Sequence, residues 1–430
     1  MWIAAIGKAE WSLRQRPLRR PDVAAVERRS SRTSSPNRAA RAAPLAAAAD
    51  ATMPARRSCR SRARRHDVLR RSGAALHEER HSDVLDIEAR KTDAARMRSA
   101  GKDVLSLALI DSRNRTLRWI GACEAALGGA ALPRTDEDLD PPLWTLGHIG
   151  WFQEHWISRN VQRHRGERCE AARPKLASIL LDADRWYDPA GAPQAQRGQL
   201  DLPDLAATRQ YLYDTLETTL DLLASAPDES DATLYFYRLA LFHEDLHAEA
   251  YAMLAQTLGF DAGLLPRLST AAPREPLVFP ATRWHLGSDA AGFAFDNERS
   301  AHDVAVPEFE IDAQAVGWAQ YCEFVEDGGY DEPLHWSRDG WLWAQRAARR
   351  TPRHVDQMRQ GVLQHRFGKL VRVPMAQPAM HVNWYEADAW CRWAGRRLPS
   401  EVEWEAAAHQ GATRGLRFGD VWEWTATTFR

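Results

Sequence analysis

Four stretches between residues 100 and 262 repeat apolar positions at the spacing of an amphipathic α-helix. They cover residues 103–127, 143–161, 205–223 and 235–258. Gly128 and Gly259 are placed to end the first and the last stretch, and residues 164–200 form a connection containing Pro, Gly and Arg. Long helices joined by one extended connection predict an all-α four-helix bundle, in which side chains from facing helices can build a site.

After Phe260 the pattern changes to short apolar runs separated by turn residues such as Gly287, Gly340 and Gly368. This pattern predicts an α+β domain of small strands and long loops over residues 272–430. Two helices in it have recognisable starts, because an N-cap residue precedes a Glu by three positions. These starts are Asn383 with Glu386 and Ser400 with Glu403.

The formal net charge of -1 is a cancellation between two unlike pieces. Residues 1–96 carry 22 Lys and Arg against 11 Asp and Glu, whereas the rest of the chain carries 35 against 47. The first piece is rich in Arg, Ala and Ser and has no sustained apolar period, so we expect it to be a disordered extension. The simplest explanation is a mis-assigned start, with Met97 or Met53 as the true one.

Composition also disfavours several classes of partner. Trp2 and Trp11 are the only aromatic residues of the basic piece, and no zinc-finger or helix-turn-helix pattern follows, so nucleic-acid binding is not expected. No stretch of 18 apolar residues is present, so we expect no membrane span. The cysteines are scattered singly, which fits reduced thiols in a cytoplasmic protein. They are Cys59, Cys123, Cys169, Cys322 and Cys391.

Three histidines are the strongest candidates for chemistry. His243 and His247 are four residues apart on one predicted helix and therefore share a face. His148, on the second predicted helix, would complete a three-nitrogen face with open positions for substrate, water or dioxygen, which is typical of a catalytic metal. Because this spacing also arises by chance, ordinary core histidines are the alternative. Three carboxylates stand nearby in the sequence: Glu244, Asp245 and Glu249.

Further motifs follow these histidines in order. They are FDNE at 295–298, FVEDGGY at 324–330, HVNWYEADAWCRWAGRRLPSEVEWEAAA at 381–408 and GDVWEWT at 419–425. Together with LGHIGWFQEHW and HEDLHAE, they resemble the ergothioneine-type sulfoxide synthases over about residues 100–430. The resemblance implies a DinB-like bundle over 100–262, then a domain of C-type-lectin-like fold, similar to the formylglycine-generating enzyme, over 272–430.

The resemblance also implies a reaction. It implies that His148, His243 and His247 bind Fe(II) and that dioxygen is activated there. A carbon–chalcogen bond would then form on hercynine, the trimethylated betaine of histidine. Small molecules are therefore the expected partners, namely hercynine, O2 and a selenosugar or thiol.

Within that family the chain is most similar to the selenoneine synthase branch, whose donor is a selenosugar. Three sequence segments carry this resemblance: GWFQEHWISRNVQR, RHVDQMRQGVLQHRFGKL and VWEWTATTFR. Sulfur enzymes that use γ-glutamylcysteine have an Arg-His-x-Arg clamp for its carboxylates, where this chain has GAPQ at 191–194 before Arg197. Leu246 also stands where the sulfur branch often has Gln. Without guanidinium groups a dicarboxylate donor loses its best partners, whereas a neutral sugar needs none.

Three other functions stay open. The first is a synthase that joins hercynine to cysteine or γ-glutamylcysteine, and the second is a DinB-like thiol transferase using Zn(II) or Ni(II). The third is a ligand-binding protein of lectin-like fold without a metal. Because the family continues beyond the WEWT motif, the resemblance also predicts a second domain that is incomplete at its C-terminus, in a chain that is poorly soluble or inactive.

Overall fold

The computed structural model describes residues 94–128, 139–264, 274–289 and 291–428. The expected N-terminal extension lies outside these ranges, apart from its last residues in the short helix α4 (Ala94–Arg98). Within the described ranges, no helix is long and apolar enough to cross a membrane. The four cysteines found there are free thiols, and Cys59 lies outside.

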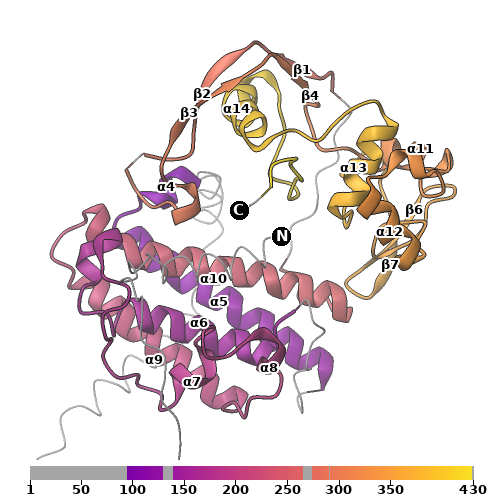
Figure 1. Ribbon diagram of the computed structural model, residues 1–430. Helices are drawn as coiled ribbons and strands as arrows, with labels where there is room; N and C mark the ends of the chain where they lie inside the picture. The colour runs from indigo at the N-terminus through magenta and orange to yellow at the C-terminus, as the bar shows by residue number, and fades with distance from the viewer. Residues whose placement is uncertain (1–93, 129–138, 265–273, 290, 429–430) are drawn as a thin grey trace, which may run out of the picture. The chain divides into compact units, whose positions relative to one another are not determined.

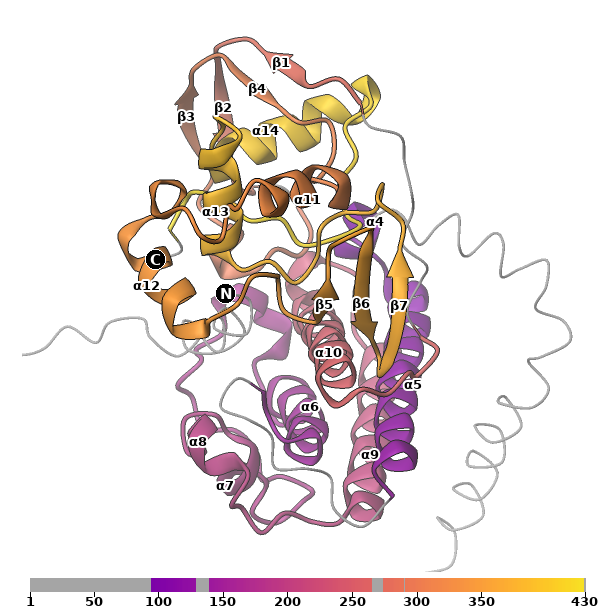
Figure 2. The ribbon, with the colours of Figure 1, turned by 90° about the vertical axis from the view of Figure 1, so that its right-hand side faces the viewer.

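The first part of the structure is helical, as predicted (Figures 1 and 2). Helix α10 packs against α5 and α6, and α9 packs against the same two helices. An apolar core rich in aromatic side chains lies between them. The long helices of this part are α5 (Lys102–Leu127), α6 (Pro142–Trp156), α9 (Leu205–Ala224) and α10 (Asp231–Leu258).

The helix ends follow from local chemistry. Gly128 and Gly259 end α5 and α10 with φ angles of 76° and 78°, a left-handed conformation that favours glycine. The Asp204 and Ser230 side chains accept hydrogen bonds from backbone N–H groups in the first turns of α9 and α10. These caps explain why the predicted bounds of these helices agree with the structure within a few residues.

One predicted helix end in the helical part is wrong. Helix α6 ends at Trp156 rather than Val161, because the Asn160 side chain accepts a hydrogen bond from the N–H of Gln162 and forms a turn. The connection over 164–200 also contains short helices, each held by i to i+3 or i+4 hydrogen bonds. They are η1 (Arg163–Arg168), α7 (Ala183–Tyr187) and α8 (Gln194–Arg197).

The second part contains small antiparallel sheets and short helices, as the α+β prediction requires. Strand β1 (Leu277–Phe279) pairs with β4 (Phe309–Ile311), and β2 (Thr282–Leu286) pairs with β3 (His302–Val306). A third sheet has the order β5-β6-β7. Its strands are β5 (Val355–Gln357), β6 (Val362–Arg366) and β7 (Lys369–Val373).

Both predicted helices of this part are present as α13 (Trp384–Trp393) and α14 (Glu401–Gly411). At the start of α13 the side chains of Asn383 and Glu386 each accept a backbone N–H from the other residue, so the capping-box prediction is confirmed. The prediction missed two further helices, which carry only one or two turns of apolar pattern each. These are α11 (Trp318–Glu326) and α12 (Arg338–Ala347).

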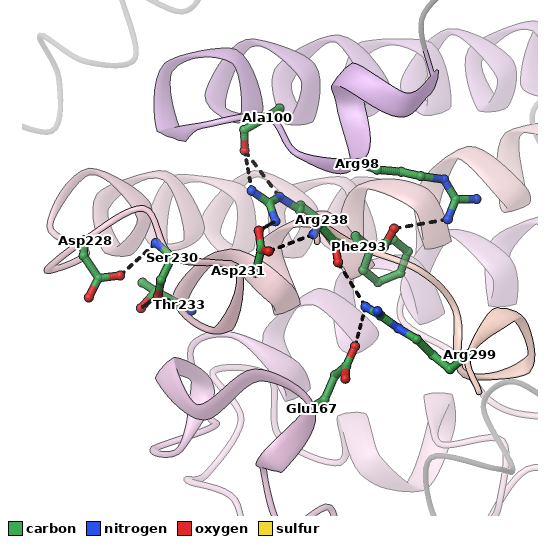
Figure 3. Close-up of polar contacts among 11 residues, drawn as sticks. Arg98, Ala100, Glu167, Asp228, Ser230, Asp231, Thr233, Arg238, Phe293 and Arg299 are labelled. Carbon is green, nitrogen blue, oxygen red and sulfur yellow. Dashed lines mark hydrogen bonds and ion pairs between the residues drawn. The ribbon is translucent and has the colours of Figure 1, made fainter. Parts of the chain in front are cut away.

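The segment around the FDNE motif is anchored to the helical part, as Figure 3 shows in part. The N–H of Gly292 donates to Asp231 at the start of α10, over 2.7 Å. Arg98 donates to the carbonyl oxygen of Phe293, over 3.1 Å, and forms a two-point ion pair with Glu298. Arg299 pairs with Glu167 of η1. Charged side chains therefore fix this segment beside the N-terminal end of α10.

Candidate metal centre

Three histidine side chains converge in the core of the helical part. His148 comes from α6, and His243 and His247 come from successive turns of α10. One ring nitrogen of each lies within 4.8 Å of the others. All three residues are at most 5 % exposed. The sequence prediction that facing helices bring these side chains together is therefore confirmed as geometry.

The spacing of the nitrogens fits a shared metal ion. The Nε2 atoms of His243 and His247 are 3.2 Å apart. Two nitrogens that each lie about 2.0–2.1 Å from one ion are separated by about 3.0–3.4 Å, depending on the angle at the metal. In the free protein this closeness requires one of the rings to donate a proton, whereas a cation would satisfy both lone pairs. The donor set of imidazoles suits iron, zinc, copper or nickel.

The orientation of His148 is fixed by a backbone group. Its Nδ1 lies 2.9 Å from the carbonyl oxygen of Tyr187, the last residue of α7. Because a carbonyl oxygen only accepts, Nδ1 carries the proton and Nε2 presents its lone pair to the other histidines. A hydrogen bond on the second nitrogen is the usual way in which proteins orient a metal-binding histidine.

Aromatic rings enclose the histidines. The ring of His148 stacks on Trp144, with centroids 4.7 Å apart, and the ring of His243 stacks on Phe152 at 3.6 Å. The connection after α6 fixes this wall, since Trp144 donates to the carbonyl oxygen of Trp186 over 2.7 Å. Trp151 likewise donates to Asp184 over 2.7 Å. The rings keep water from most of the surface of the imidazoles.

The carboxylates predicted near the histidines have other partners. Glu244 forms a buried ion pair with Arg113 of α5, with Nε and Oε1 2.9 Å apart. Asp245 accepts from Ser112 over 2.6 Å and from Arg115 over 2.7 Å. Glu249 accepts from Trp422 over 3.1 Å. These contacts connect α10 to α5 and to the C-terminal segment.

A network of buried polar side chains around α6 lies outside the sequence prediction. Arg113 is 1 % exposed and also donates to the side chain of Gln153 and the carbonyl oxygen of Leu212. The next residue of α6, Glu154, accepts from Ser178, Ile179 and Tyr211. One sequence signal could have indicated this network. A polar residue stands where the helical repeat calls for an apolar one, as Arg113 does in α5.

Electrostatics supports the role of the connection as a fixed wall. The guanidinium group of Arg159 forms two hydrogen bonds with Asp184 and, with Trp151, lowers the pKa of that carboxyl to about 2. Burial raises the pKa of the Tyr187 hydroxyl to about 12. Asp184 is therefore a carboxylate and Tyr187 a neutral phenol at neutral pH.

Comparison with known proteins agrees with this division of the chain. The DinB superfamily matches residues 108–252, and the sulfatase-modifying factor enzyme 1-like domain matches residues 269–418. Hercynine oxygenase of Mycolicibacterium thermoresistibile is 32% identical over 336 residues, which cover 75% of this chain and 70% of the relative. The enzyme of the same name from Mycolicibacterium smegmatis is 31% identical over 335 residues, covering 75% and 72%.

The chain belongs to the hercynine oxygenase family. A more distant relative, the formylglycine-generating enzyme of Mus musculus, is 26% identical over 200 residues, 41% of this chain and 53% of that protein. The three convergent histidines of this chain, His148, His243 and His247, all lie within the DinB match. The predicted pairing of a DinB-like region with a domain similar to the formylglycine-generating enzyme is thereby confirmed.

Proposed function

We propose that His148, His243 and His247 hold one Fe(II) ion and that the protein joins hercynine to a selenosugar in an O2-dependent step of selenoneine biosynthesis. The observation that carries the proposal is the convergence of three buried imidazoles, with the Nδ1 of His148 committed to the carbonyl oxygen of Tyr187. Three neutral ligands leave the charge of the ion uncompensated and keep coordination positions open.

The choice of iron rests on the relatives, which are named as oxygenases. A bound ferrous ion supplies the redox chemistry that O2 activation needs, which Zn(II) lacks. The protein itself contributes positioning. Tyr187 keeps the proton of His148 on Nδ1, and Trp144 and Phe152 restrict the rotation of the rings that they stack on. Fixed ligands and a water-poor wall favour reaction between bound molecules over side reactions.

The choice of a selenosugar as donor rests on the connection after α7. Residues 191–194, where the sulfur enzymes have their clamp, are uncharged, so they offer no guanidinium group to a carboxylate. Arg197, which follows this stretch, already pairs with Asp140 over 2.7 Å and lies 3.6 Å from the centroid of the Trp144 ring. A dicarboxylate donor would have to displace these contacts, whereas a neutral sugar would not.

The finer features of the fold belong to the same proposal. We assign a DinB-like four-helix bundle to residues 100–262 and a C-type-lectin-like fold to residues 272–430. The packing of α5, α6, α9 and α10 around one core supports the first assignment. The small antiparallel sheets with short helices support the second.

A competition assay tests the function. A full-length version of the protein is loaded with Fe(II) without oxygen and mixed with hercynine and equal amounts of selenosugar, cysteine and γ-glutamylcysteine. Oxygen is then admitted, and the products are identified by mass spectrometry, in which selenium has a distinctive isotope pattern. We expect an O2-dependent product that contains selenium.

Two variants on the same helix sharpen the assay. His148→Ala should abolish the product, whereas His155→Ala should retain it, since His155 is not among the three convergent histidines. Sulfur products alone would refute the selenosugar assignment. Equal turnover with Zn(II) and no oxygen would instead indicate a thiol transferase, and no product from any donor would contradict the proposed activity.

A further inference from the structure

Two histidines outside the metal centre face each other in the second part of the structure. His354 precedes β5 and His381 precedes α13, so they are far apart in the sequence. Their ring centroids are nevertheless only 4.9 Å apart, with the rings almost perpendicular. Among the described residues, none forms a hydrogen bond with either ring. A pair of half-buried imidazoles without protein partners is unusual, because buried polar groups are normally satisfied.

Both histidines also adopt a costly backbone conformation. The φ angle is 65° at His354 and 64° at His381, in the left-handed region that residues with a Cβ rarely enter. Such conformations cluster at binding and active sites, where the surrounding structure holds them in place. Here the N–H of His365 in β6 donates to the carbonyl oxygen of His354 over 2.8 Å and fixes one of them.

The charge around the pair is positive. Arg353 and Arg366 act on His381, and Arg353 and Arg349 act on His354. Burial lowers the pKa of His381 to about 4, together with the neighbouring His354 and the arginines Arg353 and Arg366. Burial, with Arg353 and Arg349, also lowers the pKa of His354. Within the described ranges, the guanidinium groups of these three arginines form no ion pair.

The acidic groups of this region are directed elsewhere. Asp356 of β5 lies 3.9 Å from Nε2 of His365, and both side chains are about half exposed. Glu386 of α13 accepts a hydrogen bond from Tyr330. It interacts with Arg349 electrostatically, without an ion pair. Asp261, after α10, forms an ion pair with Lys369 of β7 and interacts electrostatically with Arg366. Among the described residues, none of these carboxylates forms an ion pair with Arg353 or Arg366.

A buried amide provides a second, independent sign of a ligand. Gln364 in β6 is fully buried, and neither its Oε1 nor its Nε2 has a hydrogen-bond partner in the described part of the chain. Gln364 shares a face of the strand with Arg366, because side chains alternate along a strand. It also stands opposite Val355, the neighbour of His354. Leaving both amide atoms unpaired costs free energy unless another molecule satisfies them.

The position of Arg366 is fixed from both sides. Its neighbours His365 and Phe367 exchange hydrogen bonds with the side chain of Gln256 on α10, over 2.7 and 3.0 Å. Gly368 lies so close to Gly259 that an added Cβ would be 2.1 Å from the carbonyl oxygen of Gly259. The turn between β6 and β7 is therefore held against α10. The backbone at Arg366 would lose little conformational entropy when a ligand binds.

We infer that His354, His381, Arg353 and Arg366 form a binding site for a small oxyanion, a carboxylate or phosphate group, with the amide of Gln364 at its inner side. Guanidinium groups and neutral imidazole N–H groups are donors that match such oxygens. This site does not depend on the metal centre or on the proposed reaction.

The test is a titration of the full chain, labelled with 13C in its histidine rings, with inorganic phosphate and separately with succinate. Ionic strength and pH are held constant, and the ring signals are followed by NMR. We expect saturable shifts of the His354 and His381 signals with at least one of the two anions. The one that binds more tightly identifies the anionic group. The signal of His285, whose ring is bound to Asp303 over 2.9 Å, serves as an internal reference that should not shift.

Variants separate a built site from general attraction. The double variant Arg353→Gln/Arg366→Gln should bind the preferred anion about tenfold more weakly, because it loses two charge-assisted donors. Arg350→Gln is the matched control and should bind as the unaltered chain does, since Arg350 pairs with Asp331 over 2.6 Å.

A shift in titration provides a second readout. A bound anion favours the charged imidazole, so saturating anion should raise the pKa of His381 above its value of about 4. Absence of a saturable shift with both anions would overturn the inference and leave water as the partner of Gln364. Equal affinity in the double variant and in Arg350→Gln would overturn it as well.

Discussion

The contact between Gly147 and Tyr187 offers a sharp test of how the metal centre is held. Gly147 precedes His148 in α6, and a Cβ added to it would lie 2.1 Å from Cζ and 2.2 Å from Cε1 of the Tyr187 ring. Ordinary contact requires at least 3.4 Å, so Gly147→Ala forces α6 and Tyr187 apart by about 1.3 Å. A comparable lengthening of the 2.9 Å contact between His148 and the Tyr187 carbonyl oxygen would break that hydrogen bond.

The expected magnitudes follow from these distances. Overpacking a rigid site costs about 1–3 kcal/mol, and replacing glycine by alanine inside a helix returns about 1 kcal/mol, so we expect a net loss of up to about 2 kcal/mol in unfolding free energy. Loss of the partner that orients a metal ligand weakens metal binding by about 10–100-fold. Urea unfolding measures the first quantity, and anaerobic calorimetry with Fe(II) measures the second.

Gly121→Ala in α5 is the matched control, because the nearest atom to its added Cβ is 4.0 Å away. That variant should be more stable by about 0.5–1 kcal/mol and should bind metal as the unaltered chain does. If Gly147→Ala keeps both the stability and the metal affinity of the unaltered chain, the reasoning that Tyr187 positions His148 is wrong.

Three further predictions concern the buried charges and the turn that contacts α10. Arg113→Met leaves Glu244 buried without its partner and should lower the unfolding free energy by about 3–5 kcal/mol. The double variant Arg113→Met/Glu244→Gln should recover part of this loss, and no recovery would argue against the ion pair as the cause. Burial raises the pKa of Glu386 to about 7 from 4.5, so the folded state binds the proton more tightly. Its contribution to stability should therefore decline by at most about 3 kcal/mol as pH rises from 4.5 through 7. Glu386→Gln should flatten that part of the urea-midpoint profile, and an unchanged slope would refute the assignment. Gly368→Ala places a Cβ 2.1 Å from the carbonyl oxygen of Gly259 at a φ of 80°, so hydrogen exchange at the C-terminal end of α10 should accelerate. Unchanged hydrogen-exchange rates there would contradict the close contact between Gly368 and Gly259.

The face of α10 shows where periodicity misleads. In the sequence of this helix, apolar residues recur at helical spacing, which predicts a buried stripe with the histidines along its edge. These apolar residues are Leu239, Phe242, Leu246, Ala250 and Met253. The structure places His243, Glu244 and His247 among the buried residues instead, while Met253 is 50% exposed. Polar side chains can occupy the interior here because each is offered partners, as Glu244 is by Arg113. A hydrophobicity pattern contains no information on such pairing.

The helices of the first part were predictable because their caps are local. Asn383 and Glu386 in the second part likewise signal their helix within four residues. By contrast, α11 and α12 are short and rich in aromatic side chains, which favour helices only weakly, so packing against the rest of the domain stabilises them. The carbonyl oxygen of Tyr187 could not be predicted as the partner of His148, because only the path of the connection brings it there.

An anaerobic equilibrium titration of the chain with Fe(II) tests whether the three convergent histidines hold one metal ion. We expect one tightly bound Fe(II) per chain, lost in His148→Ala and in His243→Ala but retained in His155→Ala, with circular dichroism showing that all variants fold. Tight binding of Fe(II) by a folded His148→Ala/His243→Ala double variant would contradict the assignment of the metal centre.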